Sequence, residues 1–283
     1  MAPDQVVNAL RERLAEHPWF EVVELTRNSF KNVRGACHNG FMRSETPGHA
    51  DGELTKAQVN KAGRTIRGKM RGEPVSQDDF QWALGMLRKF RAAHRIPLTK
   101  ATMGLRSAVV AQGCRMEVTQ RLKRATTILD KLVREPTMAF STMQDIGGCR
   151  AVLDTLDEVR QVQQRLMKRG GRFPERIYDY ISTPRESGYR GVHAIVQYDN
   201  RKIEIQLRTR VMHEWAIYVE LLSAQLQFDL KGAQGPREVL EWLEAVSRAM
   251  ALEEKGIVVD RALVDQISEL RETGTTYLEG EEG

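Results

Sequence analysis

The sequence predicts an α+β protein in which a mixed, mostly antiparallel sheet of about five strands is flanked by helices. Apolar residues recur at helical spacing on both sides of a central region, and between residues 136 and 208 this spacing shortens to the alternation of strands. Two alternating runs, Gly191–Tyr198 and Arg201–Arg208, are separated only by Asp199 and Asn200, which is a typical hairpin signal.

The composition is that of an ordinary globular chain, with 283 residues, 41% hydrophobic and 29% charged. No stretch approaches the ~18 apolar residues that span a membrane, and Met1–Leu10 lacks the apolar run of a signal peptide. We therefore expect a cytoplasmic protein without membrane contact. Its cysteines, Cys37, Cys114 and Cys149, form no C-x-x-C pair, so neither disulfides nor zinc are expected.

Charge is distributed unevenly around a net value of +5. Residues 1–135 hold 24 Lys or Arg against 14 Asp or Glu, whereas residues 136–283 hold 19 against 24. A basic half indicates an anionic partner such as nucleotide phosphates or nucleic acid. A solvated helix surface explains any single run of charge equally well.

The N-terminal quarter divides into a helix and a basic segment. Val7, Leu10 and Leu14 lie at helical spacing and predict an amphipathic helix over Asp4–Glu24. Residues 27–72 contain ten Lys or Arg, three acids and many glycines with weak periodicity, which predicts a basic arm or long loop.

The rest of the chain gives helices and strands in turn. We predict helices from Ser76, from about Ala101 to Val110, from Thr119 to Leu132, over Leu156–Lys168, from Thr209 to Gln227 and from Val239 to Leu252, with a buried strand over Cys149–Leu153. The acidic tail after Thr273 is expected to be loose. Three parts follow: an N-terminal helix and basic arm (1–75), a central α+β domain (76–228) and a C-terminal helical extension with an acidic tail (229–283).

The second strand of the hairpin carries a polar row. Ile203, Ile205 and Leu207 point to one face, so Glu204, Gln206 and Arg208 point to the other. A solvated sheet face is the more common explanation for one such strand. The preceding run Gly188–His193 favours a nucleotide pocket, because Tyr189 could stack on a base while Arg190 and His193 meet phosphate. Taken singly, Tyr189 and His193 are more often structural.

A second carboxylate comes from Asp145, just before the strand that contains Cys149. Mg²⁺ prefers one or two carboxylates together with phosphate oxygens, so Asp145 and Glu204 form the predicted metal pair. Read alone, Asp145 is as readily a turn residue. Arg121, Lys123 and Lys131, which the predicted helix over Thr119–Leu132 carries, then supply cations for a polyphosphate.

Over residues 76–222 these motifs occur in an order that resembles the RelA/SpoT alarmone synthetase domain. The motifs are Arg121-x-Lys123 with Lys131, Asp145-Ile-x-Gly-x-Arg150, Asp179-Tyr-Ile-x-x-Pro184, Gly188-Tyr-Arg-x-x-His193, Glu204-x-Gln-x-Arg-Thr209 and Met212-His213. The resemblance implies a nucleotidyltransferase-like fold and a pyrophosphokinase that moves the β,γ-pyrophosphate of ATP onto the ribose 3′-hydroxyl of GDP or GTP, giving (p)ppGpp and AMP.

The resemblance also implies roles for individual residues. Arg121 and Arg150 would hold the adenine of ATP, and Lys123 and Lys131 its phosphates. Asp145 and Glu204 would bind Mg²⁺, with Glu204 also accepting the hydroxyl proton. Tyr189 would stack on the acceptor base, and the other residues of the acceptor side would be Arg185, Arg190, His193, Gln206 and Arg208.

Several departures from the family pattern leave the acceptor open. The family often has Lys at the positions of Tyr178 and Arg185 and Ser at that of Gly191. No His-Asp dipeptide occurs, which argues against the hydrolase domain of the long bifunctional members and favours a small stand-alone synthetase.

A second kind of acceptor is suggested by Arg91–Leu98 and the basic arm, which resemble toxic small members of this family. Those enzymes modify the 3′ CCA end of tRNA, and an antitoxin protein would then be a partner. A non-catalytic RNA-binding protein is a further alternative, since Lys and Arg contacts to phosphates dominate nucleic-acid affinity. A homo-oligomer is also compatible with the sequence.

Overall fold

The computed structural model describes residues 54–115, 117–168 and 174–278. The helix predicted over Asp4–Glu24 and the first part of the basic arm lie outside these residues. The described residues form one sheet of five strands in the order β1-β2-β5-β4-β3. The strands are β1 (Glu117–Leu122), β2 (Gly147–Leu153), β3 (Arg176–Asp179), β4 (Val192–Tyr198) and β5 (Arg201–Thr209).

Pairing in this sheet is mixed. Strands β2 and β5 are parallel, while β1 with β2, β4 with β5 and β3 with β4 are antiparallel. The predicted α+β class with a mixed, mostly antiparallel sheet is therefore confirmed. The predicted hairpin is confirmed as well: Asp199 and Asn200 have φ of 47° and 58°, as a two-residue turn between twisted antiparallel strands requires.

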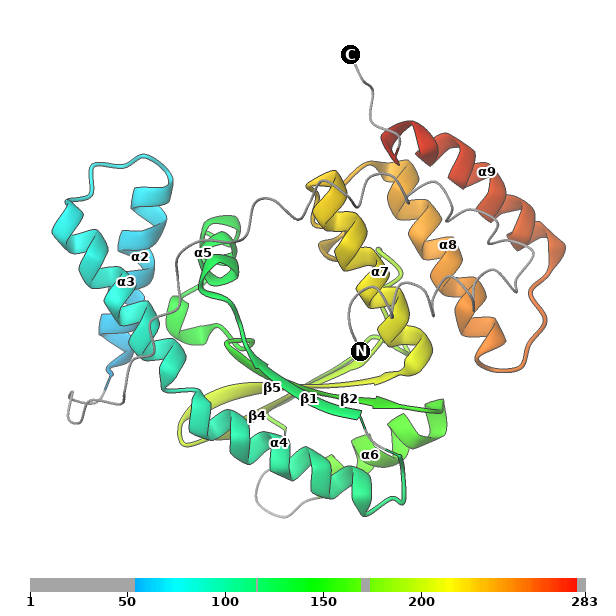
Figure 1. Cartoon of the computed structure of the whole chain (residues 1–283), viewed down its shortest axis with the longest axis horizontal. Helices are drawn as coiled ribbons and strands as arrows, with labels where there is room; N and C mark the ends of the chain where they lie inside the picture. Colours follow the sequence, from blue (N-terminus) through cyan, green and yellow to red (C-terminus); the bar gives the residue numbers. More distant parts are fainter. Residues whose placement is uncertain (1–53, 116, 169–173, 279–283) are drawn as a thin grey trace.

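Helices cover both faces of the sheet (Figure 1). Helices α4 and α6 lie on one face and α7 on the other, with α8 and α9 packed beyond α7 and the α2–α3 hairpin beside α5. The bounds are α2 (Lys56–Met70), α3 (Gln77–Ala92), α4 (Arg95–Val110), α5 (Ala125–Arg134), α6 (Leu156–Lys168), α7 (Arg210–Leu226), α8 (Arg237–Glu253) and α9 (Arg261–Leu278), with 3-10 turns η4 (Phe140–Thr142) and η5 (Leu230–Gly232). None of the described helices is both long and apolar enough to cross a membrane.

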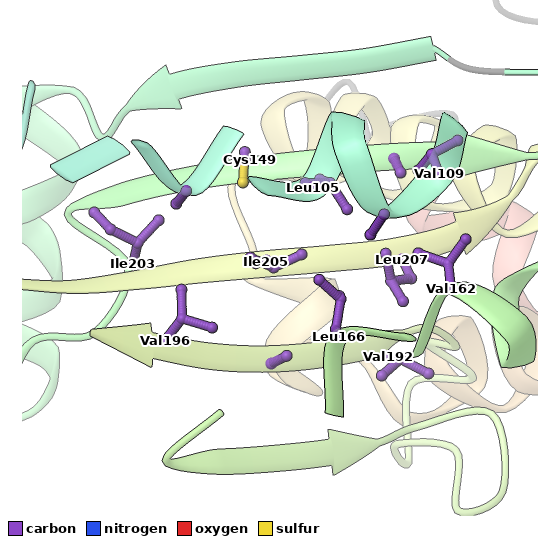
Figure 2. Packing of buried hydrophobic residues seen from close by; sticks show 14 of the residues in the cluster. Leu105, Val109, Cys149, Val162, Leu166, Val192, Val196, Ile203, Ile205 and Leu207 are labelled. Carbon is purple, nitrogen blue, oxygen red and sulfur yellow. The ribbon is translucent and has the colours of Figure 1, made fainter. Parts of the chain in front are cut away.

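The core between the sheet, α4 and α6 fixes which side of β5 is polar. Ile203, Ile205 and Leu207 are buried there with Leu105 of α4 and Val162 of α6 (Figure 2). Because side chains alternate along a strand, the residues between them must project from the opposite face. The two faces predicted for β5 are confirmed, and the polar row lies on the side of α7.

The helix predicted over Thr119–Leu132 is wrong. Residues up to Leu122 form β1, and α5 begins only at Ala125. The backbone of β1 pairs with β2, and Val118 and Leu122 pack against the core beneath the sheet. Leu122 has the spacing expected for a residue of α5, but it packs in a different hydrophobic cluster from the apolar residues of α5. Its spacing is therefore coincidental.

Within residues 54–72, the described part of the basic arm, Lys56–Met70 form a helix rather than a loop. Thr55 and Gln58 form a capping box at its start, and Val59 and Ile66 are buried against α3 and α5. The glycines of this segment weaken its helical pattern, but Gly63 has a role in packing. It allows Phe140 to approach the helix closely, since a Cβ at position 63 would lie 2.6 Å from the Cβ of Phe140. The predicted division at residue 75 thus separates two helices, α2 and α3, that share one cluster.

The C-terminal extension contains more helix than predicted. Helix α9 continues to Leu278, past the tail expected to be loose from Thr273, while residues 279–283 lie outside the described residues. Leu263 and Ile267 of α9 are buried against α8 in a cluster that also contains Tyr189 and Trp215. This extension therefore packs against the side of the domain that carries the polar face.

Candidate active site

Four strands contribute polar side chains to one face of the sheet. The register places Arg121 of β1 beside Gly148 of β2, and Gly148 beside Glu204 of β5. Neighbours in register project from the same face. The next row on this face contains Arg150, Gln206 and His193. The sheet thus brings together predicted residues that are up to 85 positions apart in the chain.

Asp145 and the two lysines form a compact group at the start of β2. The carboxylate accepts from Lys123 Nζ at 2.9 Å and from Lys131 Nζ at 3.1 Å. Lys123 directly follows β1, and Lys131 reaches the same carboxylate from α5. Burial alone would raise the pKa of Asp145, but the two lysines hold it below its usual value. The two cations predicted for ATP phosphates therefore meet at one carboxylate that stays ionised.

Five residues of β4, β5 and the loop before β4 form a closed ring of hydrogen bonds. Arg208 donates to the Tyr189 hydroxyl at 2.8 Å, that hydroxyl meets His193 Nε2 at 2.5 Å, and His193 Nδ1 lies 2.9 Å from Glu204 Oε1. On the other side Arg208 donates to Gln206 Oε1 at 3.0 Å, and Gln206 donates to Glu204 Oε2 at 2.6 Å. Both chains begin at Arg208 and end at Glu204.

A single set of proton positions satisfies the whole ring. A neutral His193 with its proton on Nδ1 donates to Glu204 and accepts from the Tyr189 hydroxyl, which in turn accepts from Arg208. Burial lowers the pKa of His193, in agreement with a neutral imidazole. Burial would raise the pKa of Glu204, but the bonds from His193 and Gln206 lower it to about 2. Glu204 is therefore a carboxylate at neutral pH.

Tyr189 is completely buried in this arrangement. The cations of Arg208, Lys231 and Arg185 lie 5.0, 5.1 and 5.6 Å from the centre of its ring. Arg185 also covers the ring of Tyr180 at 4.4 Å. A base can reach Tyr189 only after these side chains move, so base stacking on Tyr189 stays a prediction.

Arg190 does not join the other predicted residues. Its guanidinium forms a buried ion pair with Glu254 just after α8, with 2.8 Å between Nη1 and Oε2. Both side chains are at most 7% exposed. The sequence grouped Arg190 with Tyr189 and His193 in the run Gly188–His193, but in the structure its guanidinium is paired with Glu254 instead. This pair joins the loop before β4 to the end of α8, and phosphate binding by Arg190 stays a prediction.

Arg150, Arg208 and His213 influence one another on the α7 side of the polar face. Burial, then the nearby Arg208, lowers the pKa of Arg150, and its Nε is buried without a hydrogen-bond partner. Burial and Arg150 lower the pKa of His213 to about 3. Nearby cations thus disfavour the charged form of both groups, and an anion bound here would offset that repulsion.

Comparison with known proteins agrees with this geometry. Residues 120–225 match the family described as "Region found in RelA / SpoT proteins". That range contains every residue of the Asp145 group and of the hydrogen-bonded ring. Residues 120–225 are therefore similar to the RelA/SpoT region, and they are called the RelA/SpoT domain below.

Relatives of the RelA/SpoT domain include the GTP pyrophosphokinase YjbM of Bacillus subtilis strain 168, which is 36% identical over 109 residues, 35% of this chain and 52% of that protein. The GTP pyrophosphokinase rsh of Brucella melitensis is 27% identical over 166 residues, 58% of this chain and 22% of that protein. The chain thus covers about a fifth to a half of these curated relatives.

Solved structures share the fold of the RelA/SpoT domain. Small alarmone synthetase 2 of Bacillus subtilis superimposes with a TM-score of 0.51 at 20% identity, over 60% of this chain and 94% of that one. Small alarmone synthetase 1 of Bacillus subtilis, bound to its product pppGpp, gives a TM-score of 0.50 at 25% identity, over 66% and 97%. The nucleotidyltransferase-like fold expected from the resemblance is thereby confirmed.

A divalent metal fits the RelA/SpoT domain by the chemistry of its donors. Asp145 and Glu204 are both ionised, and their side chains are 22% and 17% exposed. Gly148, level with Glu204, leaves open space above the sheet, since a Cβ there would meet only the Glu204 carbonyl at 3.7 Å. Within the described ranges no group of three or more His, Cys, Asp or Glu residues could hold a metal ion by itself. Two carboxylates are a number of protein ligands that Mg²⁺ commonly takes beside phosphate oxygens and water.

Sequence reasoning missed two residues beside the RelA/SpoT domain's polar face. Lys231 of η5 lies over Tyr189 and pairs with Glu220 of α7 at 2.8 Å. Glu220 falls within the matched range and Lys231 beyond it. No sequence signal marks Lys231, because it stands in a three-residue turn that reaches the site only through the packing of α7 and α8.

Proposed function

We propose that this chain is an ATP-dependent pyrophosphokinase that transfers the β,γ-pyrophosphate of ATP to the ribose 3′-hydroxyl of GDP or GTP. The observation that carries the proposal is the group of Lys123, Lys131 and Asp145 at the start of β2, together with the ring that ends on Glu204 of the neighbouring strand β5. YjbM and rsh, named as GTP pyrophosphokinases, and small alarmone synthetase 1, described with its product pppGpp, support it.

In this proposal the cations bind and orient ATP. Arg121 and Arg150 hold the adenine, while Lys123 and Lys131 neutralise the phosphates. Because phosphoryl-type transfer depends mainly on positioning and charge neutralisation, these contacts account for most of the rate enhancement. Attack of the 3′-oxygen on the β-phosphorus forms the new P–O bond, and breaking the bond from this phosphorus to the α,β-bridging oxygen releases AMP.

Glu204 receives the hydroxyl proton in this scheme. A carboxylate whose pKa is about 2 is a weak base near neutral pH, where the best general base has a pKa close to the working pH. A loose transition state needs little help from a base, since the nucleophile is hardly deprotonated when the bond breaks. Glu204 therefore contributes chiefly negative charge and orientation of the hydroxyl, both fixed by the ring.

Asp145 and Glu204 are the residues that would hold Mg²⁺. When bound, this ion would polarise the phosphate oxygens and neutralise developing charge. The protein's own contribution is to keep both carboxylates ionised and to hold the lysines at Asp145.

The test incubates the full chain with γ-³²P ATP, Mg²⁺ and either GDP, GTP or deacylated tRNA. The measurement is which of these acceptors becomes labelled. We expect labelled ppGpp and pppGpp with release of AMP. Label on tRNA alone would replace this proposal with the tRNA-modifying reaction, and that result would justify a search for an antitoxin partner in the cytoplasm. RNA binding without any transfer would favour the non-catalytic alternative.

A further inference from the structure

Lys231 lies on the polar face beside Tyr189, the residue predicted to stack on the acceptor base. Its Nζ is 5.1 Å from the centre of the Tyr189 ring and 2.8 Å from Glu220 Oε1. Its charge acts on Arg208, His193 and Glu204. Lys231 is thus a neighbour of the hydrogen-bonded ring although it lies outside the matched RelA/SpoT range.

The backbone around Lys231 is held firmly. Leu230 is fully buried, and Asp229 caps the turn through the Gly232 amide at 3.1 Å. The Lys231 carbonyl accepts from Ser187 Oγ at 3.1 Å, which ties the turn to the loop that carries Tyr189. Arg134 of α5 pairs with Asp229 at 2.7 Å and joins the turn to the lysine-bearing helix. A turn anchored at this many points presents its side chain in a defined direction.

The side chain of Lys231 can exchange its partner for a ligand. A quarter of it is exposed, and half of the Glu220 side chain is exposed. A carboxylate that remains this solvated competes weakly for a lysine. Burial, then the nearby Arg208, lowers the pKa of Lys231 to about 8, so an additional anion would stabilise its charged form.

We propose that Lys231 binds the 5′-phosphates of the acceptor nucleotide and gives up Glu220 to do so. The segment that follows the RelA/SpoT domain thereby supplies a specificity-determining cation for a nucleoside di- or triphosphate. This inference rests on the proposed function, because that function places the acceptor at Tyr189. Lys123 and Lys131, which both contact Asp145, serve the ATP phosphates, so the two phosphate chains are recognised by separate lysines.

The test compares Lys231→Met with Lys231→Arg in the full chain. The control is Lys100→Met, which removes a lysine paired with Asp199 outside the polar face. We expect Lys231→Met to raise the KM for GDP and GTP by about tenfold to a hundredfold, the range of one charged hydrogen bond, and to leave the KM for ATP within about twofold. Lys231→Arg should restore most of the acceptor affinity, and Lys100→Met should change neither KM.

A second readout separates phosphate binding from support of the loop. Calorimetric binding of GDP and of guanosine is compared without ATP. Lys231→Met should weaken GDP binding and leave guanosine binding unchanged, because guanosine has no phosphate. Equal weakening of both ligands, or a rise in the KM for ATP alone, would overturn the inference. Lys231→Gln, which keeps a donor for Glu220, is measured in the same way if the methionine variant loses its thermal unfolding transition.

The two proposals can fail separately. If the wild type transfers no pyrophosphate but binds GDP, and Lys231→Met loses that binding selectively, the proposed function falls and the phosphate site stands. If the wild type makes (p)ppGpp and Lys231→Met keeps its acceptor KM, the phosphate site falls and the proposed function stands. A wild type that binds neither GDP nor GTP overturns both.

Discussion

Arg208 and Glu204 stand at opposite ends of two hydrogen-bonded chains although only three residues separate them on β5. One chain passes through Tyr189 and His193, and the other through Gln206. Every donor in both chains points from Arg208 toward Glu204, so the guanidinium polarises the bonds that keep the carboxylate ionised. The position and the charge of Glu204 thus depend on residues from β4, β5 and the loop before β4.

Glu204→Gln tests the role of that charge. The amide keeps the shape of the side chain but cannot replace the carboxylate as a metal ligand or proton acceptor. We expect the rate of pyrophosphate transfer to fall by about three orders of magnitude, equivalent to ~4 kcal/mol of transition-state stabilisation. Steady-state assays measure it, with Glu175→Gln, whose carboxylate pairs with Lys202 at 3.0 Å, as control. Wild-type turnover in Glu204→Gln would contradict the role that the proposed function gives to the Glu204 carboxylate.

Tyr189→Phe tests the longer chain. Loss of the hydroxyl leaves Arg208 Nε and His193 Nε2 buried without partners, since both meet only that oxygen in the ring. An unsatisfied buried polar group costs about 1–3 kcal/mol, so urea unfolding should show a loss of this order. Tyr218→Phe removes a hydroxyl from the α7–α8 interface and should change stability by less. Equal stabilities of the two variants would show that the ring contributes nothing.

Lys131→Met tests the Asp145 group. Lys131 is placed on ATP phosphates in the proposed function, so its loss should raise the KM for ATP about tenfold with little change in the KM for GDP. Initial rates at varied ATP and varied GDP measure the two constants. Lys61→Met removes a cation that lies over Trp82 on the α2–α3 hairpin and is the control. An increase confined to the KM for GDP would move Lys131 to the acceptor side.

Local sequence patterns predicted the features of the fold that depend on residues close together in the chain. The alternation over Arg201–Arg208 determines both faces of β5, and the turn at Asp199 and Asn200 determines its register with β4, so these patterns alone place Glu204, Gln206 and His193 on one face. The sequence also singled out Arg121, Lys123 and Lys131 as cations on one helix over Thr119–Leu132. That helix is wrong, because Lys123 follows β1 and Lys131 lies in α5, but both lysines meet at Asp145.

Long-range packing could not be predicted in this way. The partner of Arg190 is 64 residues away on the C-terminal extension, and Lys231 reaches the polar face from a short turn beyond α7. Helix α2 looked like a loop because its buried face is made partly of Ala62 and Gly63, which carry no periodic apolar signal. All three features depend on which helices and strands pack against each other, and the sequence of a single helix or strand does not show this.

Arg190 and Glu254 provide a test of the role of their ion pair. Removing one partner of a buried ion pair leaves an uncompensated charge, so Arg190→Met should lower the free energy of unfolding by about 3–5 kcal/mol. The double variant Arg190→Met with Glu254→Leu should regain much of that loss, because no buried charge remains. Urea unfolding of the single and double variants measures both effects. A rise in acceptor KM that persists in the stable double variant would favour phosphate binding by Arg190 over a structural role alone.

His94 gives the fold a pH dependence of known sign. It is 1% exposed, its Nδ1 lies 2.7 Å from the Phe90 carbonyl, and burial lowers its pKa to about 4. The unfolded chain, with a pKa of ~6.5, binds the proton more readily, so the stability is complete above pH ~6.5 and is lost as the pH falls toward 4. Between pH 7.5 and 5.0 this one group should remove about 2 kcal/mol.

Urea unfolding of the wild type and of His94→Gln at the two pH values measures the effect of His94. Burial and Arg150 lower the pKa of His213 to about 3, so His213 acts in the same direction and should leave part of the pH dependence in His94→Gln. The double variant His94→Gln with His213→Gln should therefore be less sensitive to pH than either single variant. If His94→Gln loses as much stability as the wild type between these pH values, His94 takes up its proton equally in the folded and unfolded chains, and the apolar contact with Phe90 does not exclude its charge.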